Sequence, residues 1–86
     1  MNSLRFKSDA WAEYIEWQSN DKKALQKINI LIKDIIRNPF SGIGKPEPLK
    51  HDLSGYISRR IDDKNRLIYS VSENEITIIS CRGHYH

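Results

Sequence analysis

The chain has 86 residues, of which 38% are hydrophobic and 29% are charged, which predicts one folded domain over residues 1–86 and excludes a disordered chain. Fourteen Lys and Arg against eleven Asp and Glu give a net charge of +3, so a polyanionic partner is permitted but not required. The sequence has no apolar run near the roughly 20 residues of a membrane span and no apolar stretch for a signal peptide. Cys81 is the only cysteine, so an intrachain disulfide is excluded and we expect a cytoplasmic protein.

The first half of the chain predicts a short strand and two helices. Apolar and basic residues alternate over 4–7 as in a strand, and Ser8 supplies an N-cap signal for the first helix. The polar segment 19–21 is typical of a cap that starts a second helix. Apolar residues then recur every three or four positions over 24–36, and Pro39 ends the pattern.

The second half predicts three strands joined by turns. Strands with alternating apolar residues are expected over 57–62, 66–71 and 75–82. In the first of these, Arg59 shares one face with Ile57 and Ile61, while Arg60 lies on the other face. With the N-terminal strand the element order is βααβββ. We therefore predict an α+β domain in which two helices cover one face of a four-stranded antiparallel sheet.

Glu47 lies between two prolines in the Gly- and Pro-rich segment that separates the two halves. Each proline fixes its own φ and biases the residue before it toward an extended conformation. Such a carboxylate is held in one direction, as an acid–base group requires. The alternative is a rigid, solvated loop with an ion-paired glutamate.

Arg59, Arg60 and Arg66 lie on adjacent predicted strands across a tight turn. Their guanidinium groups would come together around a phosphate, because each presents a planar fork of donors. The alternative is edge-strand charge that discourages aggregation.

The C-terminus ends in His84, Tyr85 and His86. His84 and Tyr85 directly extend the last predicted strand, and the ordinary pKa of histidine suits proton transfer near neutral pH. We therefore favour a functional role for these two residues. His86 is better explained as a loose tail or part of an expression tag.

Other site chemistries have little support in the sequence. Cys81 is expected in the core as a small hydrophobic residue. The three histidines and the scattered acids have no recognised metal-ligand spacing, and no Gly-rich phosphate loop links a strand to a helix, so we predict no metal and no cofactor. Trp11 and Trp17 cannot share one helical stripe, and we expect Trp11 in the core and Trp17 partly exposed.

Nearly the whole chain resembles the YoeB-type toxins, within the RelE superfamily of messenger-RNA-cleaving toxins of bacterial toxin–antitoxin systems. The stretches that carry the resemblance are Ser8–Trp17, Lys27–Asn29, Gly44–Lys50, Leu53–Tyr56, Ser58–Ile61, Arg66-Leu67 with Tyr69, and His84-Tyr85. The Gly-Lys-Pro-Glu loop, the Ser-Arg-Arg-Ile strand and the terminal His-Tyr occur in family order and at family spacing. The sequence departs from the pattern at Gly83, where relatives commonly carry a bulkier residue. His86 is an extra residue after the usual terminal tyrosine.

The resemblance implies a RelE-like fold and assigns roles to individual residues. Glu47 matches the general base, Arg66 the ligand of the transition-state phosphate, His84 the general acid and Tyr85 the aromatic residue that orients the RNA. The basic residues that we expect to face RNA phosphates are Lys45, Lys50, Arg59 and Arg60. No metal is needed, because RNA supplies its own nucleophile, the 2′-OH.

The function implied by the resemblance is a ribosome-dependent endoribonuclease that cuts messenger RNA in the A site and stops translation. The expected partners are a YefM-like antitoxin, the ribosome and messenger RNA, with DNA bound only through the antitoxin complex and a homodimer left open. The alternative is a catalytically inert member that binds an antitoxin or the ribosome without cutting. The joint presence of Glu47, Arg66, His84 and Tyr85 argues against that alternative.

Overall fold

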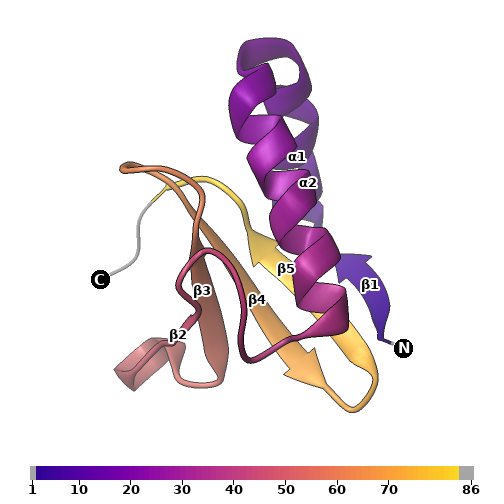
Figure 1. Ribbon diagram of the computed structural model, residues 1–86, viewed down its shortest axis with the longest axis vertical. Coiled ribbons are helices and arrows are strands. Elements are labelled where there is room, and N and C mark those ends of the chain that lie inside the picture. The colour runs from indigo at the N-terminus through magenta and orange to yellow at the C-terminus, as the bar shows by residue number, and fades with distance from the viewer. Residues whose placement is uncertain (1, 84–86) are drawn as a thin grey trace.

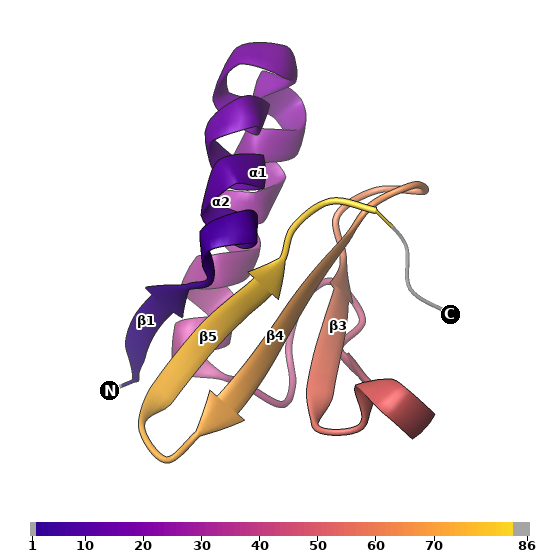
Figure 2. The same cartoon turned by 180° about the vertical axis from the view of Figure 1, so that it is seen from behind.

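Two helices lie on one face of a five-stranded sheet in the computed structural model of the protein, which describes residues 2–83 (Figure 1). The elements in chain order are β1 (Ser3–Phe6), α1 (Ser8–Asn20), α2 (Lys22–Arg37), β2 (Glu47–Pro48), the 3₁₀ helix η1 (His51–Leu53), β3 (Tyr56–Arg60), β4 (Arg66–Ser72) and β5 (Glu75–Ser80). The helical hairpin extends past one end of the sheet, and the opposite sheet face carries no helix of the hairpin (Figure 2). The predicted α+β class and the two helices are confirmed.

The sheet differs from the predicted four-stranded antiparallel sheet in strand number and in direction. Its order is β1-β5-β4-β3-β2, and β1 pairs with β5 in parallel, whereas the other pairs are antiparallel. Short turns force β3, β4 and β5 to alternate in direction. No turn dictates the direction of β1, because β1 is joined to the rest of the sheet only through the helical hairpin.

The fifth strand, β2, is a two-residue edge strand that the sequence pattern does not reveal. Glu47 pairs with Ser58 and Pro48 with Ile57, and the N–H of Leu49 donates to the carbonyl of Tyr56 at 2.9 Å. Proline has no N–H to donate, so it is tolerated at the edge of a sheet. Two residues are too few to show the alternation from which strands are predicted.

The core lies between the helices and the sheet, and α2 contributes most of its helical side. The α2 residues that are buried in it are Ala24, Ile28, Leu31, Ile32 and Ile35. They pack with Leu67 and Tyr69 of β4 and with Ile76 and Ile78 of β5. Complete burial of one such aliphatic side chain is worth about 1.5–3 kcal/mol. The predicted apolar stripe of the second helix is confirmed.

Helix α1 departs from two expectations. Its N-cap residue is Lys7 and has no side-chain capping hydrogen bond, so Ser8 is the first helical residue and not the cap. Trp11 is 51% exposed and its ring packs against Phe6 and Tyr14 at centroid distances of 5.6 and 5.7 Å. The aromatic cluster lies at the edge of the core.

Within residues 2–83, neither helix combines the length and the apolar character needed to cross a membrane.

The side chain of Asp21 caps the N-terminus of α2. Oδ1 of Asp21 accepts from the N–H groups of Lys23 and Ala24, both at 3.1 Å. Loss of such a cap typically costs about 1 kcal/mol. Asp21→Ala should lower the free energy of unfolding in urea by about this amount. Ser8→Ala, at a position without a capping role, should change it by less than about 0.5 kcal/mol, and equal effects of the two substitutions would contradict the assignment.

Candidate functional site

The strand register brings Glu47 and Arg66 to the same face of the sheet. Residues directly opposite each other on neighbouring strands point to one side. Glu47 is opposite Ser58, and Ser58 is opposite Ile68. Arg66 lies two residues from Ile68 and therefore shares its side. Ile68 is absent from the cluster of core residues beneath the helices, so this face is the one turned away from the helices.

The distance between Glu47 and Arg66 is large enough for a phosphate to lie between the carboxylate and the guanidinium. Two strand spacings of about 4.8 Å and two residue rises of about 3.4 Å separate Glu47 from Arg66, so their α-carbons are about 12 Å apart. Glu47 is exposed and Arg66 is half-buried. Both side chains are long enough to reach a phosphate lying between them.

Arg60 and Arg66 are directly opposite each other on β3 and β4. Like charges in this arrangement repel. Arg60 is balanced by an ion pair with Asp63 in the following turn, whereas among residues 2–83 Arg66 has no ion-pair partner. An anion bound at this point would relieve the repulsion.

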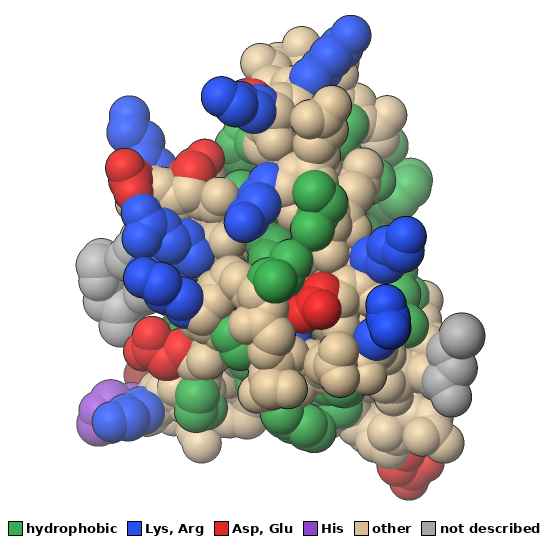
Figure 3. Space-filling view, in the orientation of Figure 1, with side chains coloured by type: hydrophobic (Ala, Val, Ile, Leu, Met, Phe, Trp, Pro, Cys, Tyr) green, Lys and Arg blue, Asp and Glu red, His purple; other side chains and the backbone are tan. Residues whose placement is uncertain are grey.

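Lys45 and Lys50 are exposed on either side of the short strand that carries Glu47. The loop before them is fastened to β3, because the carbonyl of Gly44 accepts from the N–H of Arg60 at 2.7 Å. Figure 3 shows Lys and Arg side chains gathered on the β2–β3 side of the molecule, at the left of the view, with acidic side chains among them. The register of β2 on β3 and the hydrogen bond between Arg60 and Gly44 thus place Arg60, like Lys45 and Lys50, near Glu47.

Arg59 does not belong to this surface, and the expectation that it faces RNA phosphates is wrong. Its side chain is fully buried, with 0% exposure. It lies on the helix-facing side of β3, next to Tyr69, as the predicted alternation with Ile57 and Ile61 already required. A buried guanidinium whose donors are occupied cannot contact RNA in this structure.

Each of the five donors of Arg59 has a partner. Nε donates to Oη of Tyr69 at 3.1 Å, and Nη1 donates to Oδ2 of Asp34 at 2.5 Å. The remaining bonds go to three loop carbonyls, those of Asn38, Ser41 and Ile43. Asp34 also accepts from the N–H of Ile43 at 3.1 Å, and Tyr69 donates to the carbonyl of Pro39 at 2.6 Å. Arg59 therefore binds α2, β4 and the 38–43 loop together.

Asp34 and Tyr69 are the two residues of this network that the sequence analysis missed. The hydrogen bond from Arg59 lowers the pKa of Asp34, and burial raises the pKa of Tyr69. The available signal was Arg59 itself, a charged residue on a predicted core face, which requires an acidic partner. No local pattern identifies Asp34 as that partner.

Two glycines allow the loop to pass close to the network. A Cβ added to Gly42, whose φ is +126°, would lie 2.1 Å from Oδ2 of Asp34, and one added to Gly44, whose φ is +78°, would lie 2.6 Å from Leu31. Both positions therefore require glycine. The loop that leads into Glu47 is held in place by these contacts and by Arg59.

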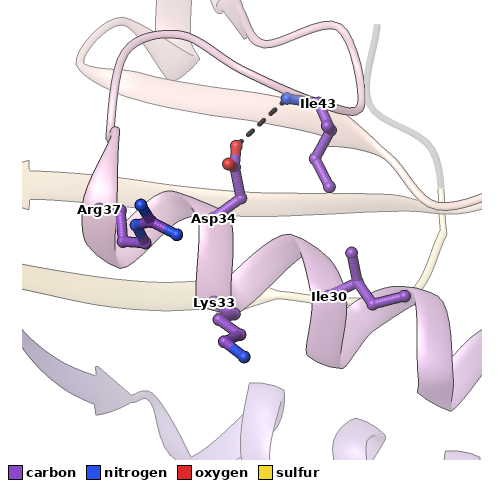
Figure 4. Close-up of a pocket in the computed structure, with 5 residues that line it drawn as sticks. All are labelled: Ile30, Lys33, Asp34, Arg37 and Ile43. Atoms are coloured by element: carbon purple, nitrogen blue, oxygen red, sulfur yellow. Dashed lines mark hydrogen bonds between the residues drawn. The ribbon is translucent and has the colours of Figure 1, made fainter.

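A shallow groove of about 320 Å³ lies on the helix side of the molecule. It is lined by Ile30, Lys33, Asp34, Arg37 and Ile43 (Figure 4). None of the predicted site residues lines it. The carboxylate of Asp34 turns from the groove wall toward the backbone of Ile43, so the only acidic group there is engaged in holding the loop.

The C-terminal segment reaches Gly83 beside Arg66, whose N–H donates to the carbonyl of Gly83 at 2.9 Å. His84 and Tyr85, predicted as general acid and RNA-orienting residue, lie outside the described residues, as does His86. Their roles stay predictions.

Metal and thiol chemistry find no site within residues 2–83. No three His, Cys, Asp or Glu side chains in this range lie close enough together to hold a metal ion. Cys81 is fully buried, and burial raises the pKa of its thiol to about 12. The expectation that Cys81 is a core residue is confirmed, and a thiol that stays protonated at neutral pH is a poor nucleophile.

The chain is similar to known proteins over nearly its whole length. Residues 6–85 match the family described as "YoeB-like toxin of bacterial type II toxin-antitoxin system". A relative from Synechocystis sp., named Toxin YoeB, is 55% identical over 82 residues, which are 95% of each chain.

Solved structures of such proteins have the same fold. A YoeB/ParE toxin from Agrobacterium tumefaciens has a TM-score of 0.94 and 45% identity over 96% of this chain and 99% of that one. A YoeB dimer from Staphylococcus aureus has a TM-score of 0.90 and 49% identity, over 98% of both chains. The YoeB chain of a heterotetrameric YoeB–YefM toxin–antitoxin complex from the same species has a TM-score of 0.89 and 49% identity, over 99% of both chains.

Removal of one partner from the Arg59 network should destabilise the protein strongly. Arg59→Ala leaves Asp34 without its partner and should cost about 3–5 kcal/mol. Asp34→Asn keeps four of the five acceptors and should cost about 1.5–3 kcal/mol. Arg60→Ala, which removes an exposed ion pair, should cost less than about 1 kcal/mol. Urea denaturation of the three variants measures this order, and an Asp34→Asn protein as stable as the Arg60→Ala protein would contradict it.

The same network predicts a pH dependence. Because the Arg59 hydrogen bond lowers the pKa of Asp34 in the folded state, the ionised carboxylate stabilises the fold fully above the ordinary aspartate pKa of about 3.9. This stabilisation is lost as the pH falls through the lowered pKa. The difference in free energy of unfolding between wild type and Asp34→Asn should therefore shrink below about pH 4. A difference that grows on acidification would contradict this sign.

Proposed function

Because this chain belongs to the family of YoeB-like toxins of bacterial type II toxin–antitoxin systems, we propose that it inhibits translation as a ribosome-dependent endoribonuclease that cuts messenger RNA in the A site. The observation that carries the proposal is the strand register that sets Glu47 and Arg66 on the sheet face turned away from the helices. A carboxylate and a guanidinium on either side of a phosphate are suited to transesterification of RNA.

In the proposed reaction, Glu47 takes the proton of the 2′-OH as that oxygen attacks the adjacent phosphorus. Negative charge develops on the phosphorane oxygens, and Arg66 and Arg60 stabilise it. Donors that are already in place typically contribute about 10²–10³-fold in rate. The P–O bond to the 5′-oxygen breaks, which leaves a 2′,3′-cyclic phosphate on the upstream fragment.

The departing 5′-oxygen needs a proton, and we assign its donation to His84, with Tyr85 orienting the RNA. The assignment comes from the resemblance of the His84-Tyr85 ending to that of the family. It is supported by the position of Gly83, which is hydrogen-bonded beside Arg66 and directly precedes His84. Lys45 and Lys50 supply further positive charge to the RNA backbone. The scheme uses no metal and no cofactor.

The partners proposed for this chain follow from those of its relatives. The Staphylococcus aureus YoeB occurs with YefM in a heterotetramer and also as a dimer, both with about half of their residues identical to this chain. We propose a YefM-like antitoxin and a homodimer for this protein, with DNA bound only through the antitoxin complex. Its proposed site of action is the cytoplasm, where ribosomes translate messages.

Glu47→Gln tests the proposed base, because the amide keeps the size of the side chain and cannot take a proton. The wild type should cut a defined message that purified ribosomes are translating, and the cleavage rate should fall about 10²–10⁴-fold with the variant. Glu73→Gln is the matched control, since Glu73 is exposed in the turn between β4 and β5. Its cleavage rate should equal that of the wild type.

The same assay distinguishes the alternative function. A wild-type protein that binds ribosomes or a YefM-like antitoxin and leaves the message uncut would be an inert binding module. Growth arrest on induced expression that Glu47→Gln relieves would support the nuclease. Arrest of equal strength with Glu47→Gln would count against Glu47 as the base.

A message with one 2′-deoxynucleotide tests the nucleophile. With the deoxynucleotide directly 5′ of the scissile phosphate, cleavage at that bond should stop, because the attacking oxygen is missing. The control message carries the deoxynucleotide two positions upstream and should be cut normally. Cleavage of the first message at the same bond, in the presence of a chelator, would show that the acid–base scheme of Glu47 and His84 is wrong.

A further inference from the structure

The side chain of Asn65 connects the β3–β4 turn to the C-terminal segment. Its Nδ2 donates to Oδ1 and Oδ2 of Asp62 at 3.1 and 3.2 Å. Its Oδ1 accepts from the N–H of Gly83 at 3.0 Å. The next residue, Arg66, donates its N–H to the carbonyl of the same glycine at 2.9 Å. Gly83 is therefore held at both ends of its backbone.

The turn itself does not need this side chain. The carbonyl of Asn65 accepts from the N–H groups of Ile61 and Asp62, and Oδ1 of Asp62 accepts from the N–H groups of Lys64 and Asn65, both at 2.8 Å. These contacts close the turn without the side-chain amide of Asn65. The bond from Asn65 Oδ1 to Gly83 serves the C-terminal segment alone.

Gly83 needs such support because glycine does not fix its own conformation. Its φ is +89°, and among residues 2–81 no atom lies within 4 Å of a Cβ built on it. A glycine in open space is free to choose among many backbone directions. The backbone of Gly83 is thus held by its hydrogen bonds to Asn65 and Arg66.

The amide is the group that fits this position. It must donate to the carboxylate of Asp62 and accept from the N–H of Gly83, and asparagine carries both functions on one short side chain. An aspartate would place a second carboxylate against Asp62, and an alanine would offer neither function. The two contacts also fix which atom of the amide is oxygen.

We propose that Asn65 is a positioning residue: its amide, braced by Asp62, holds Gly83 against Arg66 and so acts on catalysis through His84, the residue that follows Gly83 in the sequence. This inference rests on the proposed nuclease function for its effect on catalysis. The contact itself does not depend on that function.

Asn65→Ala tests both parts. The N–H of Gly83 should exchange with solvent about 10-fold faster in the variant, as measured by NMR, because one hydrogen bond is lost. Under single-turnover conditions, cleavage should slow about 10- to 100-fold, as small misplacements of a reacting group do, with the KM for ribosomes changed less than about twofold. Asn74→Ala is the control, because Asn74 lies in the turn at the opposite end of β4 and should leave both measurements unchanged.

A double-mutant cycle with His84→Ala separates positioning from general destabilisation. If Asn65 acts through His84, adding Asn65→Ala to His84→Ala should slow cleavage by less than about twofold. The same loss in both backgrounds, or unchanged exchange of Gly83, would overturn the inference. If the wild type cuts no message, the proposed function fails together with the catalytic part of the inference, and the exchange of Gly83 still decides the contact.

Discussion

A single buried cation, Arg59, holds the loop that leads to the proposed catalytic residue Glu47 in place. A charge in the interior is tolerated only when its donors are satisfied, and here every donor of Arg59 has an acceptor. The acceptors come from α2, from β4 and from the loop that leads to Glu47. The loop has no regular structure of its own, so its path is dictated by the requirement that Arg59 stay paired.

Each of the two helices holds, by hydrogen bonds, one segment that leads to the proposed site. Asp34 of α2 fastens the loop before Glu47. Glu13 and Trp17 of α1 fasten the segment after β5, since Glu13 accepts from the N–H of Cys81 at 2.8 Å and Trp17 donates to its carbonyl at 2.9 Å. Neither helix contributes a residue to the proposed chemistry. Each holds a segment that leads to a residue of the proposed chemistry, Glu47 in one case and His84 in the other.

The division of the sheet into two faces explains how so short a chain accommodates both a core and a site. One face packs against the helices, and its apolar residues belong to one continuous core cluster. The other face carries Glu47, Arg60 and Arg66. RNA can be bound on such a face without a deep cavity, because phosphates are recognised by charge and by forked donors at a surface.

Local patterns in the sequence determined the two helices, the cap at Asp21, the strands β3 to β5 and, with the family resemblance, Glu47 and Arg66 as candidate site residues. Each of these depends on neighbours a few positions apart, where periodicity and turn chemistry are informative. The direction of β1, the existence of β2, the exposure of Trp11 and the pairing of Arg59 with Asp34 were decided only by the tertiary structure. Arg59 and Asp34 are 25 positions apart, and β1 meets β5 across most of the chain. Such contacts form when distant segments pack together, and no local pattern encodes which segments will meet.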